Sequence, residues 1–538
     1  MYLRPGRRTR AIVYAGALLT TPILHGLTFP PASLHWVAWV ALVPWFVALR
    51  LASTGGALVL TSVITLAGSY AVAGWLPRGV AMYYGQPLIV GIGFFVGVWI
   101  VTVGPWVLVF TVCYRALARR LTTPRGLATL PLLAGAAWTG TELGRVRLLI
   151  GDPFGLFGYS QVGIAPMMQI ADITGVYGIS FLLACVNIGF AELCVSLGMR
   201  QLRAGAAAGM LAAAVAVALA LGYGVVRLSG DLVQGPSTPV AIVQGNLDLG
   251  SQWRQEFYGR NLETYLRLSL TALRDSHPPL LFWPESAMTF FLEDQPAYRA
   301  SIASVLTPSG AELVAGGPRS VGTDTRPHYY NSGFLISPQG SVLAAYDKQR
   351  LLPFAEYFPF GGIELLRREF ARVREFTPGG PVTLLPTIAG AAGVVICNEV
   401  MFGEIAGERV RAGAVYLVNL TNDSWLGDSQ FAAQAFDMAR LRAVEQRRYL
   451  VRASTSGPSA IVDPFGRVVV HSRSESRDTI VGSVQARTTL TAYGRVGDVF
   501  GVLCAIVPLA ILLLELAAGR RSRRTASDKI LGSRPTNI

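Results

Sequence analysis

The sequence predicts two joined parts: a multi-span α-helical membrane domain and a water-facing α/β domain. Composition is the first indication, because 52% of the 538 residues are hydrophobic and only 14% are charged, which is typical of a membrane protein with a substantial polar region. The order of segments is the second, since long apolar stretches fill residues 1–230, a polar region spans 238–488, and another apolar stretch follows. The third is that short β-type runs alternate with helical stretches in the polar region.

Each apolar stretch is close to the ~20 residues that a helix needs to cross a bilayer. Arginines precede the first, near 11–27, and no small-residue cleavage site follows cleanly, so we expect a retained helix rather than a signal peptide. Further spans are expected near 34–50, 55–75, 87–113, 127–144, 176–198 and 206–227. We therefore predict about seven membrane helices over 1–230, a last transmembrane helix over 496–518 and a basic cytoplasmic tail over 519–538.

Arginine placement predicts the orientation. With a cytoplasmic N-terminus, fifteen arginines fall in inside segments, whereas the short outer loops hold three, Arg78, Arg145 and Arg147. Positive residues favour the cytoplasmic side, so we expect both termini inside and residues 238–488 facing the periplasm or its equivalent. Membrane topology also explains the net charge of +14, because the arginines lie beside apolar segments instead of forming a separate basic domain. Nucleic acid is therefore not an expected partner.

The polar region alternates strands and helices, as an α/β layered domain does. Helical stretches are expected at Glu256–Arg274 and Gln430–Gln446. The predicted strands are Val240–Gln244, Leu280–Trp283, Glu312–Ala315, Gly333–Ile336, Val394–Ile396, Val415–Asn419 and Ala460–Val462. Polar groups stand at several strand ends, namely Gln244, Glu285, Cys397 and Asn419. We expect such groups to gather a site along one edge of a sheet.

One cysteine and one lysine stand out in the polar region. Cys397 is the only one of five cysteines there, since the other four lie in apolar runs, so no disulfide framework is expected. A lone cysteine on an apolar strand is ordinarily a small buried hydrophobe. However, Lys348 and Lys529 are the only lysines among 46 Lys and Arg residues, and Lys529 lies in the tail. A lysine kept against that bias suggests a compact ammonium that arginine cannot replace.

Glu285 and Lys348 can supply what a cysteine nucleophile needs. A thiol must become a thiolate before it attacks a carbonyl, and a glutamate at an apolar strand end can be the base. A lysine ammonium can stabilise the oxyanion that follows. Taken singly, a carboxylate near a strand end is more often a cap or an ion-pair partner, but together the groups point to Glu–Lys–Cys acyl transfer. The histidines are scattered, so we expect no metal and no cofactor.

Five ordered motifs carry a resemblance to a known family. They are WPES (283–286), YDKQRLLPFAEYFP (346–359), ICNE (396–399), TNDSWLG (421–427) and MARLRAVE (438–445). The set resembles the carbon–nitrogen hydrolase, or nitrilase, superfamily, and with membrane spans on both sides it is similar to the apolipoprotein N-acyltransferase family of bacteria. The stretches GDPFGLFGYSQ (151–161) and QGN (244–246) also resemble that family. The resemblance implies a nitrilase-like αββα sandwich over 238–488.

The resemblance also implies roles for the matching positions. Glu285 would be the general base, Lys348 the oxyanion stabiliser and Cys397 the nucleophile. The substrate-binding or supporting residues would be Glu356, Glu399, Trp253, Asn422 and Trp425. Asn398 is a departure, because the family commonly has an aromatic residue after the cysteine, and this bears on how the pocket edge contacts an acyl chain.

The implied reaction moves an acyl chain from a phospholipid, typically phosphatidylethanolamine, to Cys397 as a thioester. The α-amine of the N-terminal S-diacylglyceryl-cysteine of an apolipoprotein would then take it, in the bacterial inner membrane, and we expect a monomer. A membrane-tethered carbon–nitrogen hydrolase, or amidase, that acts on a lipid or peptide amide would share the three residues. A hydrolase of soluble amides, however, needs at most one anchor. A transporter or scaffold would need intramembrane charged pairs, and acidic residues in the expected spans are few: Glu142, Asp172 and Glu192.

Three peripheral features leave alternatives open. Apolar residues recur at helical spacing in Ile363–Phe376, which fits an interfacial arm and an ordinary surface helix equally. Arg145 and Arg147 can hold a lipid phosphate or simply flank a helix end. Four aromatic residues are expected in interfacial belts rather than in a binding pocket: Trp75, Tyr83, Tyr84 and Trp106.

Overall fold

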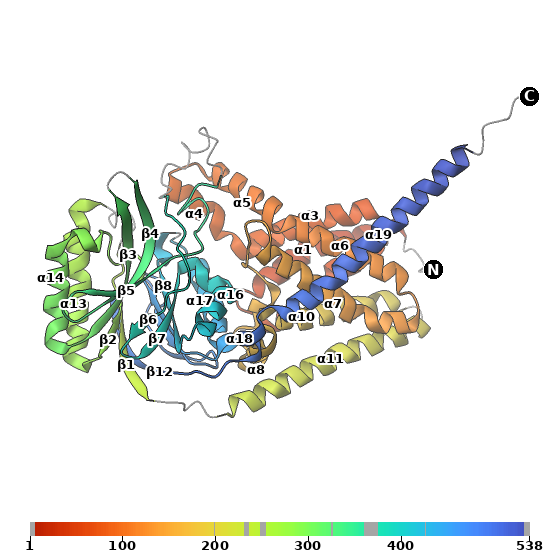
Figure 1. Cartoon of the computed structure of the whole chain (residues 1–538). Helices are drawn as coiled ribbons and strands as arrows, with labels where there is room; N and C mark the ends of the chain where they lie inside the picture. Colours follow the sequence, from red (N-terminus) through yellow and green to blue (C-terminus); the bar gives the residue numbers. More distant parts are fainter. Residues whose placement is uncertain are drawn as a thin grey trace, which may run out of the picture.

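The structure is a computed structural model that describes residues 6–197, 200–230, 236–247, 254–323, 326–359, 375–425 and 427–531. A helical bundle built from the first 230 residues lies beside a domain of two sheets and their covering helices (Figure 1). The last helix returns along the bundle, and it ends on the side away from the sheets (Figure 1). The chain therefore places one membrane-type part and one layered part next to each other.

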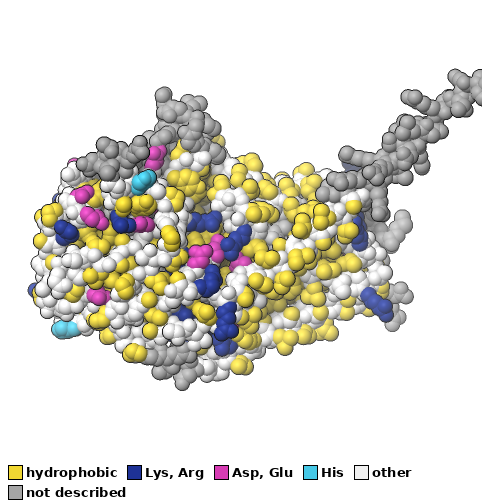
Figure 2. Space-filling view, viewed as in Figure 1, with side chains coloured by type: hydrophobic (Ala, Val, Ile, Leu, Met, Phe, Trp, Pro, Cys, Tyr) yellow, Lys and Arg dark blue, Asp and Glu magenta, His cyan; other side chains and the backbone are white. Residues whose placement is uncertain are grey.

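The bundle is formed by α1 (Arg7–Leu27), α2 (Val43–Leu51), α3 (Thr54–Ala73), α4 (Trp75–Tyr84), α5 (Leu88–Thr102), α6 (Gly104–Arg120), α7 (Pro124–Arg147), α8 (Ala165–Met168), α9 (Ala171–Thr174), α10 (Val176–Ser196), α11 (Arg200–Leu228) and α19 (Val499–Leu531), with the 3₁₀ turns η1 (His35–Trp39) and η2 (Phe157–Gln161). Figure 2 shows mostly apolar side chains on this half of the molecule.

Three helices in the described part of the chain are long and apolar enough to cross a membrane: α3, α10 and Leu202–Leu228 of α11. The pair α5 and α6, bent by 44°, passes together as a fourth span. Two shorter apolar helical stretches lie at His35–Leu51 and Val499–Leu514. The expected total of eight spans therefore stays a prediction.

The helices depart from the predicted spans at four places. The stretch 87–113 is two helices, because Pro105 stands at the start of α6, where its fixed φ and missing N–H favour a new helix over continuation. The stretch 34–50 begins as the 3₁₀ turn η1. The outer loop that holds Arg78 is the helix α4. Finally, α19 continues to Leu531 and covers most of the expected tail.

The layered domain contains twelve strands among the described residues: β1 (Ser237–Gln244), β2 (Leu280–Phe282), β3 (Glu312–Thr323), β4 (Arg326–Ile336), β5 (Val342–Asp347), β6 (Leu385–Thr387), β7 (Gly390–Ile396), β8 (Tyr416–Thr421), β9 (Leu450–Ser454), β10 (Ala460–Val462), β11 (Val468–His471) and β12 (Asp478–Gln485). Its helices are α13 (Tyr258–Ser276), α14 (Pro296–Leu306), α16 (Gly403–Arg411), α17 (Ser429–Gln446) and α18 (Ala492–Val496). The 3₁₀ turns are η3 (Gln255–Phe257), η4 (Leu292–Asp294), η5 (Thr307–Ser309), η6 (Cys397–Met401) and η7 (Asp423–Trp425).

These strands form two six-stranded sheets within the described residues, in the orders β12-β1-β2-β3-β4-β5 and β11-β10-β9-β8-β7-β6. All seven predicted strands are present. The prediction missed β5, β6, β9, β11 and β12. Strand β9 is not predicted because Arg452 interrupts its apolar pattern. This arginine is nevertheless fully buried, and its Nη2 lies 2.8 Å from Oδ2 of Asp423.

Side-chain alternation along the strands creates the layers. On β7, Val394 and Ile396 pack in the core between the two sheets, whereas Val395 packs on the opposite face. The outer face of the first sheet is covered by α13 and α14 (Figure 1). The outer face of the second sheet is covered by α16 and α17. The predicted αββα sandwich beside a helical membrane domain is confirmed.

The α16–α17 layer also contacts the membrane helices. Buried residues of this layer and of the bundle belong to one continuous apolar core. At its centre the ring of Phe431 on α17 lies 4.8 Å from that of Trp75 on α4 and 5.8 Å from that of Phe154. The layered domain is thus fused to the bundle through packed side chains, which fixes the position of its strand ends relative to the membrane helices.

Candidate active site

The three residues expected to do the chemistry follow three strand ends. Glu285 comes after β2, Lys348 directly after β5 and Cys397 directly after β7. The first two strands belong to one sheet and the third to the sheet that faces it. The sandwich therefore brings a carboxylate, an ammonium and a thiol together at one end of its inner space, and each of the three residues is less than a tenth exposed.

Lys348 is held between two carboxylates. Its Nζ lies 2.8 Å from Oε2 of Glu356 and 3.8 Å from Oε1 of Glu285. Burial alone would lower the pKa of Lys348, but the two carboxylates outweigh it and raise that pKa. The lysine is therefore a fixed positive charge, as expected of a residue that must meet a developing oxyanion.

The Glu285 carboxylate has its own donors. Its Oε1 accepts a hydrogen bond of 2.7 Å from Nδ2 of Asn331, and its Oε2 accepts one of 2.8 Å from the backbone N–H of Asn422. Burial raises the pKa of Glu285, while Lys348 opposes that shift. A carboxylate with a raised pKa is a better proton acceptor than an ordinary glutamate, which suits a general base.

Asn331 is a site residue that sequence reasoning missed. Its Nδ2 also donates to Oε1 of Glu356 at 2.7 Å, so one amide bridges both carboxylates that flank Lys348. The sequence offers no motif around it. Only the pairing register of the strands could have revealed it, because β4 pairs with β5 so that the N–H of Lys348 donates to the carbonyl of Asn331.

Cys397 opens the turn η6 with a backbone φ of 50°. This left-handed conformation is uncommon for a residue with a side chain and often marks a functional position. Burial, followed by the charge of Glu285, raises the pKa of Cys397, and Lys348 lowers it. The sulfur is thus a thiol until a base takes its proton, with both charged neighbours close enough to influence it.

Glu399 supports the site without lining the cavity. It is fully buried, and its Oε1 accepts hydrogen bonds from the Tyr346 hydroxyl and from the backbone N–H groups of Gln349 and Arg350, at 2.8, 2.8 and 3.1 Å. Its Oε2 accepts the N–H of Ile396 at 2.8 Å. Glu399 therefore ties the loop after Lys348 to the strand that ends at Cys397, and it does so from outside the cavity lining.

The remaining predicted residues divide into three groups. Asn422 lies in the site through its N–H to Glu285, and Asn398 lines the cavity, with its Nδ2 donating to the carbonyl of Arg350 at 3.3 Å. Trp425 is the last residue of η7. Trp253 and residues 363–374 of the expected arm lie outside the described residues.

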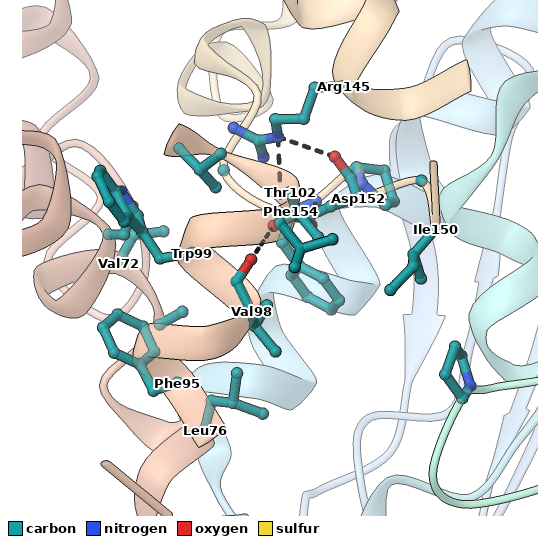
Figure 3. A pocket seen from close by; sticks show the side chains of 18 of the residues that line it. Val72, Leu76, Phe95, Val98, Trp99, Thr102, Arg145, Ile150, Asp152 and Phe154 are labelled. Atoms are coloured by element: carbon teal, nitrogen blue, oxygen red, sulfur yellow. Dashed lines mark hydrogen bonds and ion pairs between the residues drawn. The ribbon is translucent and has the colours of Figure 1, made fainter. Parts of the chain in front are cut away.

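A large, mostly apolar cavity leads from the membrane helices to Cys397. Its volume is about 1170 Å³. The walls come from α1 and α3–α7, from the 149–155 loop, and from the segment 349–358 after Lys348. Figure 3 shows the side chains of one part of this cavity. A chain-like apolar ligand in this cavity can therefore extend along a mostly apolar wall as far as the thiol.

The expectation of interfacial belts is wrong for three of the four aromatic residues. Trp75 is 5% exposed and donates to Oε1 of Gln434 at 3.2 Å. The Tyr84 hydroxyl donates to the carbonyl of Phe354. Both line the cavity, as does Trp106. Amphipathic rings near a helix end look the same in sequence whether they face lipid headgroups or an internal cavity.

Arg145 and Arg147 differ in their contacts. Arg147 pairs with Asp498 at 2.5 Å and with Glu404 at 3.2 Å, and so it joins α7 to the layered domain. Arg145 lines the cavity. No group of three His, Cys, Asp or Glu side chains in the described part of the chain could hold a metal ion.

Comparison with known proteins reveals relatives over most of the chain. A family model for the carbon-nitrogen hydrolase domain matches residues 239–493, and one for the apolipoprotein N-acyltransferase N-terminal domain matches residues 22–189. An apolipoprotein N-acyltransferase of Geobacter metallireducens is 33% identical over 511 residues, covering 93% of this chain and 94% of that protein. One of Bradyrhizobium diazoefficiens is 35% identical over 427 residues, covering 75% and 76%.

Among solved structures, an amidase of Nesterenkonia AN1 from the nitrilase superfamily is 19% identical, with a TM-score of 0.37, and the match covers 49% of this chain and 96% of that chain. The family models and the relatives confirm the resemblance carried by the five sequence motifs. The chain belongs to the apolipoprotein N-acyltransferase family, within the carbon–nitrogen hydrolase superfamily.

Proposed function

We propose that this membrane protein transfers an acyl chain from a phospholipid to the α-amine of the N-terminal S-diacylglyceryl-cysteine of apolipoproteins, through a thioester on Cys397. The observation that carries the proposal is the apolar cavity that joins the membrane helices to Cys397. Both substrates are anchored in the bilayer by acyl chains, so a thiol at the end of a cavity that is walled by membrane helices can meet each in turn.

In the first half-reaction, Glu285 takes the proton of the Cys397 thiol as the sulfur attacks the ester carbonyl of the phospholipid. The carbonyl oxygen becomes an oxyanion, which the Lys348 ammonium stabilises. The C–O bond then breaks, and Glu285 returns the proton to the departing glycerol oxygen. The products are a lysophospholipid and an acyl thioester. The raised pKa of Glu285 supports this role.

In the second half-reaction, the apolipoprotein amine attacks the thioester carbonyl. Lys348 again faces the oxyanion, Glu285 accepts a proton from the amine, and the C–S bond breaks as an amide forms. The Cys397 thiolate then regains its proton from Glu285, which restores the starting state. Glu356 and Asn331 hold the charged pair in place through their contacts with Lys348 and Glu285.

Hydrolysis of the thioester has to be slower than aminolysis. The mostly apolar lining of the cavity supports this, because it offers few hydrogen-bond partners that could hold water beside the sulfur. The alternative is a membrane-tethered amidase, which would use the same three residues and release the acyl group to water. The cavity favours the transferase, since a hydrolase of soluble amides has no use for a path from the membrane helices.

The arginine asymmetry supports an orientation with the layered domain on the outer face of the bacterial inner membrane and both termini in the cytoplasm. We propose that the protein acts there as a monomer. Reactivity of an exposed cysteine introduced into α13 toward a membrane-impermeant maleimide in intact spheroplasts tests the orientation. Labelling only after lysis contradicts it.

The test of the reaction is mass spectrometry of the purified protein after incubation with phospholipid alone, with Cys397→Ala for comparison. We expect a hydroxylamine-labile acyl adduct on wild type and none on the variant. A diacylated lipopeptide should then discharge the adduct and become N-acylated. If neither adduct nor free fatty acid forms, the proposal fails. If fatty acid is released while the lipopeptide stays unmodified, the amidase replaces it.

A further inference from the structure

Arg145 occupies an unusual position for an arginine, on the wall of an apolar cavity. It lies in the last turn of α7, and its side chain is 11% exposed. Figure 3 shows Arg145 joined by dashed lines to Asp152, above Val98 and Phe154. A cation in such a place needs a partner that satisfies its charge and its N–H groups.

Other residues of the chain satisfy the charge and the N–H groups of Arg145 only in part. Its Nε donates to the backbone carbonyl of Asp152 at 2.9 Å, while the nearest carboxylate oxygen, Oδ2 of Asp152, is 3.8 Å from Nε. Nη2 is buried and has no hydrogen-bond partner among the described residues. A well-formed Arg–carboxylate pair would instead place two N–H groups on two oxygens.

Asp152 is occupied by other donors. Its Oδ1 accepts the backbone N–H of Phe154, and its Oδ2 accepts the Thr102 hydroxyl, both at 3.0 Å. The carboxylate therefore fixes the 149–155 loop against α5 and holds Arg145 in place without pairing with its Nη groups. The indole N–H of Trp106 is a second buried donor without a hydrogen-bond partner among the described residues, and its ring packs against Gly144 beside Arg145.

Arg147 gives the contrast. It lies two residues further along the same helix, but two carboxylates, Asp498 and Glu404, pair with it, and it does not line the cavity. The sequence leaves both arginines as candidates for a lipid phosphate. The structure separates them, because only Arg145 combines a cavity position with a free donor.

We propose that Arg145 binds the phosphodiester of the acyl-donor phospholipid, with the Trp106 N–H as a second donor, while the acyl chain to be transferred extends toward Cys397. The inference rests on the proposed function and adds a headgroup subsite to it. A phosphodiester offers acceptors only, which matches a site with unused donors. The planar guanidinium suits phosphate oxygens better than an ammonium would.

The experiment compares two acyl donors. One is dipalmitoyl phosphatidylethanolamine in detergent micelles, and the other is the p-nitrophenyl ester of palmitic acid, which carries no phosphate. For Arg145→Gln we expect thioester formation from subsaturating phospholipid to fall at least tenfold, and that from the ester to stay within twofold. Trp106→Phe, which keeps the ring and removes the N–H, should act in the same direction more weakly. Arg147→Gln is the matched control and should leave the ratio of the two rates unchanged.

Equal loss with both donors would overturn the inference, because Arg145 would then only support the fold. No loss with either donor would overturn it too. Binding of the phospholipid to Cys397→Ala, with and without Arg145→Gln, measured by native mass spectrometry, tests the contact separately from chemistry, so failure of the proposed reaction is distinguishable. Competition by inorganic phosphate at concentrations equal to those of the lipid would assign the site to a free anion instead.

Discussion

The amide of Asn331 bridges Glu285 and Glu356 with two hydrogen bonds of 2.7 Å, and Asn331→Ala should therefore shift the pH dependence of acylation. A hydrogen bond to a charged group contributes about 1.5–3 kcal/mol, which corresponds to about 1–2 pKa units. The bond favours the ionised form of Glu285, so its loss raises a pKa that burial already holds high. The base is active when deprotonated, so the acid limb of the profile should move up by about 1–2 pH units.

The assay is the rate of thioester formation on Cys397 from phospholipid between pH 5 and pH 9. The rate of Asn331→Ala should fall about 10–100-fold on the acid side and recover above the new pKa. Ser332→Ala is the matched control, because the Ser332 hydroxyl donates to Asp347 at 2.6 Å and touches neither carboxylate of the Lys348 pair. A uniform loss of rate with an unmoved acid limb would refute this reasoning and leave Asn331 with a purely structural role.

Three further predictions concern the same site. Lys348→Arg should reduce thioester formation at least ~100-fold, because the bulkier guanidinium cannot take the place of the ammonium between Glu356 and Glu285. Retention of the rate within tenfold would contradict this prediction. Glu399→Gln should destabilise the fold by ~2–5 kcal/mol, since a buried amide would turn an N–H₂ toward existing donors. Tyr346→Phe, which removes only one of these donors, should cost only ~1 kcal/mol. Equal shifts of the two variants in thermal unfolding would contradict this difference. Gly316→Ala should lower the acylation rate at least ~10-fold, because its Cβ would lie 2.7 Å from Cα of Glu285. Gly380→Ala, with no atom within 4 Å of the added Cβ, should leave the rate unchanged.

The sequence was sufficient to predict the parts of the site that depend on strand ends. Glu285 and Cys397 each follow a predicted apolar strand. The strand before Lys348, β5, was missed, and Lys348 stood out only because it is the one lysine of the polar region. Asn331 could not be found this way, because its role depends on the register of β4 against β5 and on the ion pair between Lys348 and Glu285, which lie far apart in the sequence. The bend between α5 and α6 was missed for another reason: the stretch is apolar throughout, and hydropathy is insensitive to Pro105.

The aromatic residues near α4 illustrate a second limit. Hydropathy separates apolar from polar positions, but it does not separate lipid-facing from cavity-facing ones, since both surroundings favour amphipathic rings. Trp75 and Tyr84 were therefore assigned to the wrong surface. The contacts that correct this, with Gln434 and Phe354, join residues more than 250 positions apart in the chain.

The continuous core between the α16–α17 layer and the membrane helices has a consequence for anyone who wishes to isolate the sandwich. Residues such as Met438, Leu441 and Phe431 belong to the buried core that the two parts share. Cutting the chain at about residue 236 would therefore expose a large apolar surface to water. Secretion or crystallisation of the excised half would need that face redesigned. A water-soluble sandwich that docks on membrane helices in this way likewise needs apolar residues on the outer face of one of its helical layers.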